Sequence, residues 1–67
     1  MIKTLYFHGD AADQATRSFE TGEPTRLTGI DPTGQPTICN GIVSVLEYSP
    51  WTTRYDGRQW RATMRWE

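Results

Sequence analysis

The C-terminal stretch QWRATMRWE, residues 59–67, alternates between two kinds of side chain. One set is apolar and consists of Trp60, Ala62, Met64 and Trp66. The other set is polar and basic, and includes Arg61, Thr63 and Arg65. Because successive side chains of a β-strand point to opposite faces of the sheet, the pattern predicts a strand with one apolar and one basic face. The basic face is either a binding surface or the solvated outside of a small sheet.

Three earlier segments also have the composition of strands, with β-branched and aromatic residues between turn signals: residues 2–8, 25–31 and 37–48. In the first of them apolar residues fall on both faces, which is typical of a strand with neighbours on both sides, as in a barrel. The sequence DPTGQP, residues 31–36, predicts a turn. Gly41, in the middle of the longest strand, predicts a bulge or a sharp bend.

Residues 10–21 have the pattern of one short helix. Asp10 is a good N-cap, Ala15 and Phe19 recur at helical spacing, and Gly22 is a typical C-terminal stop. The apolar stripe is thin, so Phe19 is expected to be the main anchor of a helix that would be marginal in isolation. The alternative is a loose acidic loop.

Residues 51–66 predict a β-hairpin that turns at Asp56-Gly57, a pair typical of two-residue turns with positive φ at both positions. This turn sets a register of three cross-strand pairs: Tyr55 with Arg58, Thr53 with Trp60, and Trp51 with Ala62. The register places the aromatic residues of this segment, together with Arg58, on one face, and Arg54, Arg61 and Arg65 on the other.

The predicted elements make a mainly β (α+β) fold, a small, strongly bent antiparallel sheet with one short helix near the N-terminus. Its expected closed form is a five-stranded barrel, an architecture analogous to Src-homology-3-like and Sm-like barrels. The 67 residues are expected to form a single small globular domain, 1–67, with eight aromatic residues available for its core. Architecture of this kind does not determine a function.

A single cysteine, Cys39, excludes an internal disulfide and fits a reducing compartment. No apolar run is as long as a membrane span, and the N-terminal residues lack the pattern of a signal peptide. We therefore expect a cytoplasmic protein that has no contact with a membrane.

The formal net charge of −1 conceals an asymmetry between the two ends of the chain. Residues 1–33 carry a net charge of −2, whereas residues 51–66 carry four arginines against one aspartate and a net charge of +3. Long-range steering toward nucleic acid requires a strongly basic domain, which this chain is not. A local basic patch in the C-terminal third is still compatible with the composition.

The candidate binding residues all lie in that C-terminal third: Trp51, Arg54, Tyr55, Arg58, Arg61 and Arg65. Arginine, tyrosine and tryptophan are enriched in protein interfaces. The leading hypothesis is a non-enzymatic protein–protein interaction module, an adaptor, inhibitor or accessory protein, whose partner is another protein or a second copy of the chain. A structural domain of a larger assembly is a further interpretation.

The same arginines support an alternative hypothesis, a nucleic-acid-binding protein, because guanidinium groups match the oxygens of phosphate. The expected placement of the aromatic residues on the opposite face weakens it, since single-strand binders stack bases on aromatic rings. In the simplest interpretation the arginines are solvated and pair with acidic neighbours such as Glu47 and Asp56.

Catalytic and metal chemistry have little support in the sequence. One histidine and one cysteine cannot complete a four-ligand zinc site, and the acidic residues do not match a calcium loop. A nucleophilic arrangement of His8, Asp10 and Cys39 has no supporting motif. A core this small also has difficulty enclosing a pocket of several hundred Å³. We expect no enzyme activity, cofactor, metal or small-molecule substrate.

Overall fold

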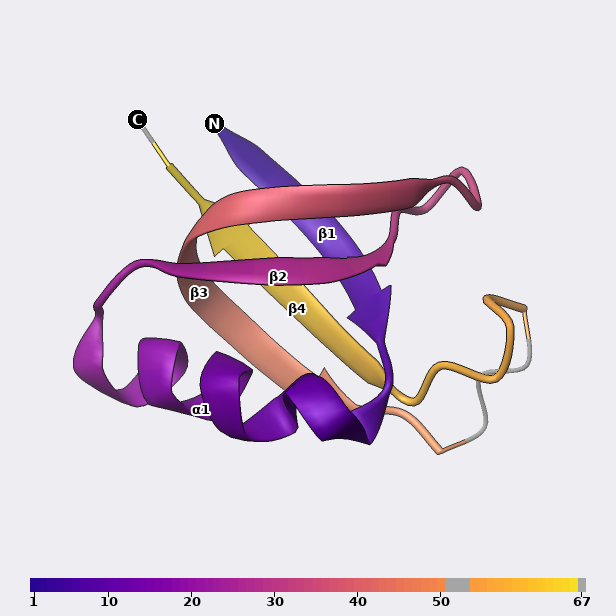
Figure 1. Cartoon of the computed structure of the whole chain (residues 1–67), viewed down its shortest axis with the longest axis horizontal. Coiled ribbons are helices and arrows are strands. Elements are labelled where there is room, and N and C mark those ends of the chain that lie inside the picture. The colour runs from indigo at the N-terminus through magenta and orange to yellow at the C-terminus, as the bar shows by residue number, and fades with distance from the viewer. Residues whose placement is uncertain (51–53, 67) are drawn as a thin grey trace.

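The computed structural model describes residues 1–50 and 54–66 (Figure 1). The elements follow in the order β1 (Ile2–Phe7), the 3-10 turn η1 (Gly9–Ala11), α1 (Ala12–Thr21), β2 (Thr25–Ile30), β3 (Pro36–Tyr48) and β4 (Trp60–Arg65). The fold is therefore mainly β with one short helix, as the sequence predicts.

The four strands form an antiparallel sheet that closes on itself in the order β1-β2-β3-β4. β4 pairs along its whole length with β1 on one side and β3 on the other, whereas β1 meets β2 through a single pair, Tyr6 opposite Ile30. In Figure 1, β2 and the first half of β3 cross in front of β1 and β4. The core lies between these two layers.

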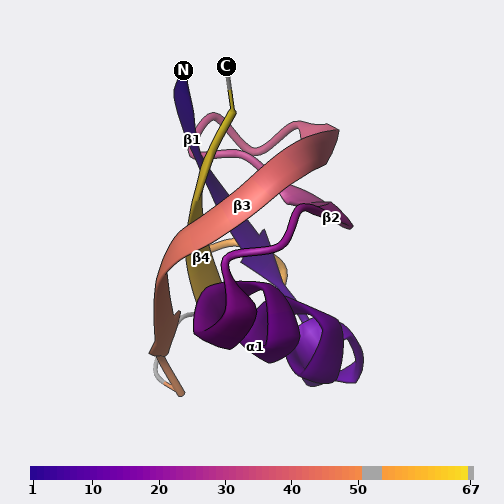
Figure 2. The ribbon, with the colours of Figure 1, turned by 90° about the vertical axis from the view of Figure 1, so that its left-hand side faces the viewer.

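β3 is long and strongly bent, and it serves both layers (Figure 2). Its first half pairs with β2 up to Gly41, and its second half pairs with β4 from Ile42 onward. A Cβ atom on Gly41 would lie 2.6 Å from the backbone oxygen of Arg65, so the close approach of the two strands excludes any larger residue. The predicted bend is confirmed, and a register shift follows it between Val43 and Val45.

The core consists of side chains from every strand and from α1. The buried hydrophobic residues are Leu5, Phe7, Ala15, Leu27, Cys39, Val43, Ala62 and Met64. Trp60 and Trp66 are partly buried against this cluster, whereas Arg61 and Arg65 are exposed. The alternation predicted for the C-terminal strand is confirmed, with its apolar face toward the core.

The predicted helix is present, but it begins differently. α1 follows η1 directly and is capped by Ala11, so Asp10 lies inside η1 and the prediction that it is the N-cap was wrong. An N-cap residue has extended backbone, and here the chain is extended at His8 and is already turning at Asp10. Gly22, with a φ of 74°, ends the helix as predicted.

The anchor of α1 is not Phe19, which is 49 % exposed, but the neighbouring Ser18, which is buried. The Ser18 hydroxyl accepts a hydrogen bond from the Val43 backbone N–H (3.0 Å) and donates one to the Glu23 carbonyl (2.6 Å). Small residues, Ala15 and Ser18, let the helix backbone come close to β3, and the larger Phe19 side chain is left at the margin of this contact.

The Asp56-Gly57 turn is confirmed, since both residues have positive φ and the Arg58 N–H donates to the Tyr55 carbonyl (3.2 Å). The partners predicted for Trp60 and Ala62 were wrong. Trp60 lies opposite Tyr48 and Phe7, and Ala62 lies opposite Leu46 and Leu5. β1 and β3 thus pair with the two edges of β4.

As a result, the described residues form four strands, one fewer than the predicted five. β3 is 13 residues long and bends, so one strand fills two positions of the sheet. Residues 49–59 connect it to β4. The predicted partners Trp51 and Thr53 lie outside the described residues.

Candidate functional site

The side chains of β1, β4 and β3 that point away from the core form one continuous surface, which we name the outer face. Directly paired residues in a sheet point to the same side, so the register defines its rows. The rows are Ile2–Arg65–Ile42, Thr4–Thr63–Val45 and Tyr6–Arg61–Glu47.

Apolar and basic side chains lie side by side on this outer face. Ile2 is 73 % exposed and Val45 is 44 % exposed, and Arg61 and Arg65 are also exposed. Among the described elements, α1 packs on the opposite, inner side of the sheet, where Ser18 contacts β3. The outer face therefore combines exposed aliphatic groups with exposed arginines.

One end of the outer face carries two stacked tyrosines. The rings of Tyr6 and Tyr55 have centroids 4.0 Å apart and are inclined by 11°, and the Tyr55 hydroxyl donates to the Pro32 carbonyl (3.2 Å). The Arg54 guanidinium lies 5.5 Å from the centroid of the Tyr55 ring, within cation–π distance. The expectation that Tyr55 shares the apolar face of the C-terminal strand was therefore wrong.

Arg61, in the same row of the outer face as Tyr6, forms an ion pair with Glu47 on β3. The predicted pairing of an arginine with Glu47 is thus confirmed for this residue. Both side chains are nearly half exposed, so the pair contributes little to stability, but it neutralises one positive charge of the outer face.

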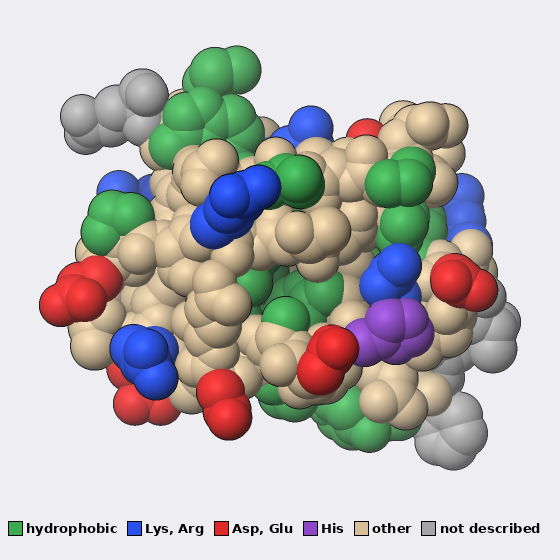
Figure 3. Space-filling model, in the orientation of Figure 1, with side chains coloured by type: hydrophobic (Ala, Val, Ile, Leu, Met, Phe, Trp, Pro, Cys, Tyr) green, Lys and Arg blue, Asp and Glu red, His purple; other side chains and the backbone are tan. Residues whose placement is uncertain are grey.

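Arg58 does not join the outer face. It lines a groove between β2 and the start of the helical segment, together with His8, Asp10 and Arg26. Figure 3 shows a hollow between β2 and α1, with hydrophobic side chains at its bottom and a basic side chain beside a histidine at one end. This groove has a volume of about 360 Å³.

The predicted site residues are thus divided by the structure. Arg54, Tyr55, Arg61 and Arg65 lie on or beside the outer face, and Arg58 lies in the groove. Trp51 lies outside the described residues. Sequence analysis missed Ile2, Tyr6 and Val45 as site residues, although the alternation of Tyr6 with the buried Leu5 and Phe7 is a signal that could have placed it outward.

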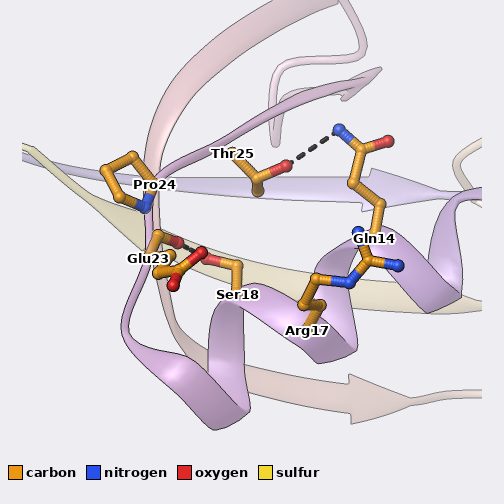
Figure 4. Close-up of a pocket in the computed structure, with 6 residues that line it drawn as sticks. All are labelled: Gln14, Arg17, Ser18, Glu23, Pro24 and Thr25. Carbon is orange, nitrogen blue, oxygen red and sulfur yellow. Dashed lines mark hydrogen bonds between the residues drawn. The ribbon is translucent and has the colours of Figure 1, made fainter.

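A smaller pocket of about 140 Å³ lies where α1 meets the start of β2 (Figure 4). The Gln14 side-chain amide donates to the Thr25 hydroxyl (2.8 Å) and to the Arg26 carbonyl (2.5 Å), and Ser18 donates to the Glu23 carbonyl. The pocket is below the usual size of ligand sites. These bonds hold the helix on the sheet.

Trp66 is ordered by its own chain. Its N–H donates to the Met1 carbonyl (3.0 Å), and the N-terminal ammonium donates to the Trp66 carbonyl (2.6 Å), which ties the two ends together (Figure 2). The indole packs partly against the core and borders a groove of about 350 Å³ that includes Pro24 and Ile42. Trp66 therefore packs on its own domain.

The residues considered for nucleophilic chemistry lie in different environments. Cys39 is 4 % exposed inside the core, and burial raises the pKa of its thiol, which disfavours the reactive thiolate. His8 and Asp10 are exposed at the rim of the Arg58 groove. Within residues 1–50 and 54–66, no three metal-ligating side chains are grouped, and no helix has the length and apolarity to cross a membrane.

Comparison with protein-family models, with curated proteins and with solved structures finds no significant match to this chain. Its function is therefore argued from the two surfaces described above, the outer face and the Arg58 groove. They differ in shape and composition. The outer face is a sheet surface with exposed aliphatic groups, whereas the groove is concave and has charged groups at its rim.

Proposed function

We propose that this protein is a non-enzymatic interaction module that binds a partner protein through its outer face. The observation that carries the proposal is the exposure of Ile2 and Val45 in strand register with Arg65 and Thr63. Protein interfaces combine buried apolar anchors with tyrosine and arginine, and the outer face offers all three. The proposal keeps Arg54, Tyr55, Arg61 and Arg65 of the predicted set.

Three features favour a protein partner over nucleic acid. Arg61 is already paired with Glu47, so a phosphate group would compete with a carboxylate for this arginine. Bases need a free aromatic ring to stack on, but Tyr6 and Tyr55 stack on each other, and Arg54 lies over the Tyr55 ring. Exposed Ile2 and Val45 add nothing to phosphate binding and suit an apolar partner surface.

The composition of the outer face also defines the partner's chemistry. Arg54 and Arg65 are exposed at opposite ends of this surface, and Ile2 and Val45 lie nearer Arg65. A complementary partner would present an apolar patch opposite Ile2 and Val45, with acidic residues facing Arg65 and Arg54 at the two ends. The proposal includes the architectural analogy with Src-homology-3-like barrels and a cytoplasmic location, the latter supported by the single, buried thiol of Cys39.

The test is affinity capture from a lysate of the source cells, with three single-residue variants beside the wild-type protein. Val45→Glu and Arg65→Glu alter the outer face, whereas Arg17→Glu makes the same charge change on α1 and is the matched control. We expect a specific protein to be retained by wild type and Arg17→Glu and to be lost with both outer-face variants. Retention by all four proteins would contradict the proposal.

A titration with a mixed-sequence oligonucleotide, followed by amide NMR, distinguishes the nucleic-acid alternative. Phosphate contacts weaken steeply between about 50 and 200 mM salt because binding releases counterions. Saturable shifts of the amide signals of Arg54 and Arg65 at low salt that vanish at high salt would contradict a protein partner and favour the nucleic-acid alternative. We expect no saturable shift at either salt concentration.

A further inference from the structure

The groove beside Arg58 has an apolar floor and a polar rim. Phe7 and Leu27, both 1 % exposed, lie at the floor together with Ala11. The rim includes Arg58 and Arg26, which approach from different parts of the chain. The volume of about 360 Å³ lies within the range of small-ligand sites, and the site is an external groove, not a cavity enclosed by the core.

The Arg58 side chain is unusual in its hydrogen bonding. Its Nε atom is shielded from solvent and has no hydrogen-bond partner among the described residues. A guanidinium that has lost part of its hydration without gaining an acceptor is costly, and such groups call for a compensating partner. An anion in the groove would offset this cost, because it would place a negative charge beside the guanidinium.

The charges around the groove limit the kind of anion. Arg26 and Arg58 carry two positive charges, and Asp10 carries one negative charge on the same rim. Asp10 would repel a phosphate dianion more strongly than a monoanion. The apolar floor formed by Phe7 and Leu27 would leave a purely inorganic ion without a partner on that side.

From these observations we infer that the groove binds a small organic carboxylate. Its carboxylate group pairs with Arg58 and Arg26, and its apolar part lies on Phe7 and Leu27. This site is separate from the outer face, so the test of the carboxylate site is independent of the test for a protein partner. It departs from the sequence-based expectation, which was that the protein has no small-molecule substrate.

The test is a two-dimensional NMR titration of the whole protein with sodium hexanoate, a carboxylate with a flexible apolar tail. Sodium chloride at matched ionic strength and inorganic phosphate are titrated in parallel. We expect hexanoate to shift the amides of Leu27 and Thr28 and the side-chain Nε–H of Arg58 saturably, with a dissociation constant of about 1 to 10 mM. Chloride should leave these signals in place, and phosphate should shift them much less.

Charge-neutralising variants locate the site. Arg58→Gln and Arg26→Gln should each weaken hexanoate binding about tenfold, because each removes a charge-assisted contact. Arg17→Gln makes the same change on α1, outside the groove and the outer face, and should leave the affinity unchanged. Since Arg26 is exposed, its variant keeps the test valid if Arg58→Gln fails to fold.

Three results would overturn the inference. The first is the absence of saturable shifts in the groove up to about 50 mM hexanoate, well above the expected dissociation constant. The second is an equal loss of affinity in Arg17→Gln and in the groove variants, which would indicate a general charge effect. The third is a phosphate response as strong as that of hexanoate, which would assign the groove to inorganic anions and not to carboxylates.

Discussion

The inner and outer faces of β4 differ completely, although both are made by the same six residues. Ala62 and Met64 are fully buried against the core, whereas Arg61 and Arg65, one position away, are exposed on the outer face. The backbone hydrogen bonds to β1 and β3 are common to both sides. The comparison shows that packing constrains the inner side, whereas the outer side is free to vary and is therefore the side on which binding residues can be placed.

The largest expected effect tests this difference on two adjacent residues of the strand. Met64→Ala removes a fully buried side chain and leaves a cavity, so it should lower the free energy of unfolding by about 2–5 kcal/mol. Arg65→Ala truncates an exposed side chain and should change it by no more than about 0.5 kcal/mol. Urea denaturation followed by circular dichroism measures both. Similar values for the two variants would contradict the assignment of the faces.

An intermediate effect is expected at Ser18, the buried polar residue of the inner side. Ser18→Ala leaves the Val43 N–H and the Glu23 carbonyl without the hydroxyl that they share, so stability should fall by about 1–3 kcal/mol. The adjacent Phe19 is half exposed, and Phe19→Ala should cost less than the loss of the hydroxyl. If the Phe19 variant proves the less stable of the two, the helix is anchored by its aromatic side chain, as the sequence first predicted.

The smallest effect is expected in the turn between β2 and β3, which is held by hydrogen bonds and not by packing. The Asp31 carboxylate accepts bonds from the Thr33 hydroxyl (2.6 Å) and from the backbone N–H groups of Gln35 and Thr33 (2.9 Å each). Thr33 first, and then Gln35, lower the pKa of Asp31. The contribution of Asp31 to stability is therefore present above the ordinary carboxyl pKa and is lost as the pH falls toward the lower folded-state value.

Asp31→Asn should therefore lower the melting temperature slightly at pH 7. The difference between variant and wild type should shrink as the pH falls below about 4, where the wild-type carboxylate is progressively protonated. Thermal denaturation of both proteins from pH 7 to pH 2 measures this difference. A gap that stays constant over the whole range would show that the charge of Asp31 has no part in holding the turn.

Local patterns predicted the elements of this fold well. The alternation from Trp60 to Trp66 identified both the strand and its buried face, and Gly22 ended the helix. The Asp56-Gly57 pair formed the expected turn, and Gly41 marked the bend of β3. For the turn and for the end of the helix, the determining interaction lies within a few residues of the signal, so the information is present in the local sequence. At Gly41 the signal is local, but the need for glycine comes from the backbone of Arg65, far along the chain.

Pairing partners could not be predicted in the same way. The turn at Asp56-Gly57 indicated a partner strand immediately before it, but β3 occupies that position after bending past Gly41. The helix anchor was misassigned for a similar reason, because the burial of Ser18 depends on its hydrogen bond to Val43, 25 residues further along the chain.

The sequence by itself indicated the four strands, the helix and the two-faced character of β4, because side-chain periodicity depends only on local backbone geometry. It also predicted a fifth strand before the Asp56-Gly57 turn, but Arg54 and Tyr55 lie in the turn itself. The tertiary structure alone decided which residues share a surface. It brought Tyr55 onto Tyr6, placed Ile2 and Val45 beside the arginines, and directed Arg58 into a separate groove. These contacts join residues far apart in the chain, and their positions follow from how the bent sheet closes around its core.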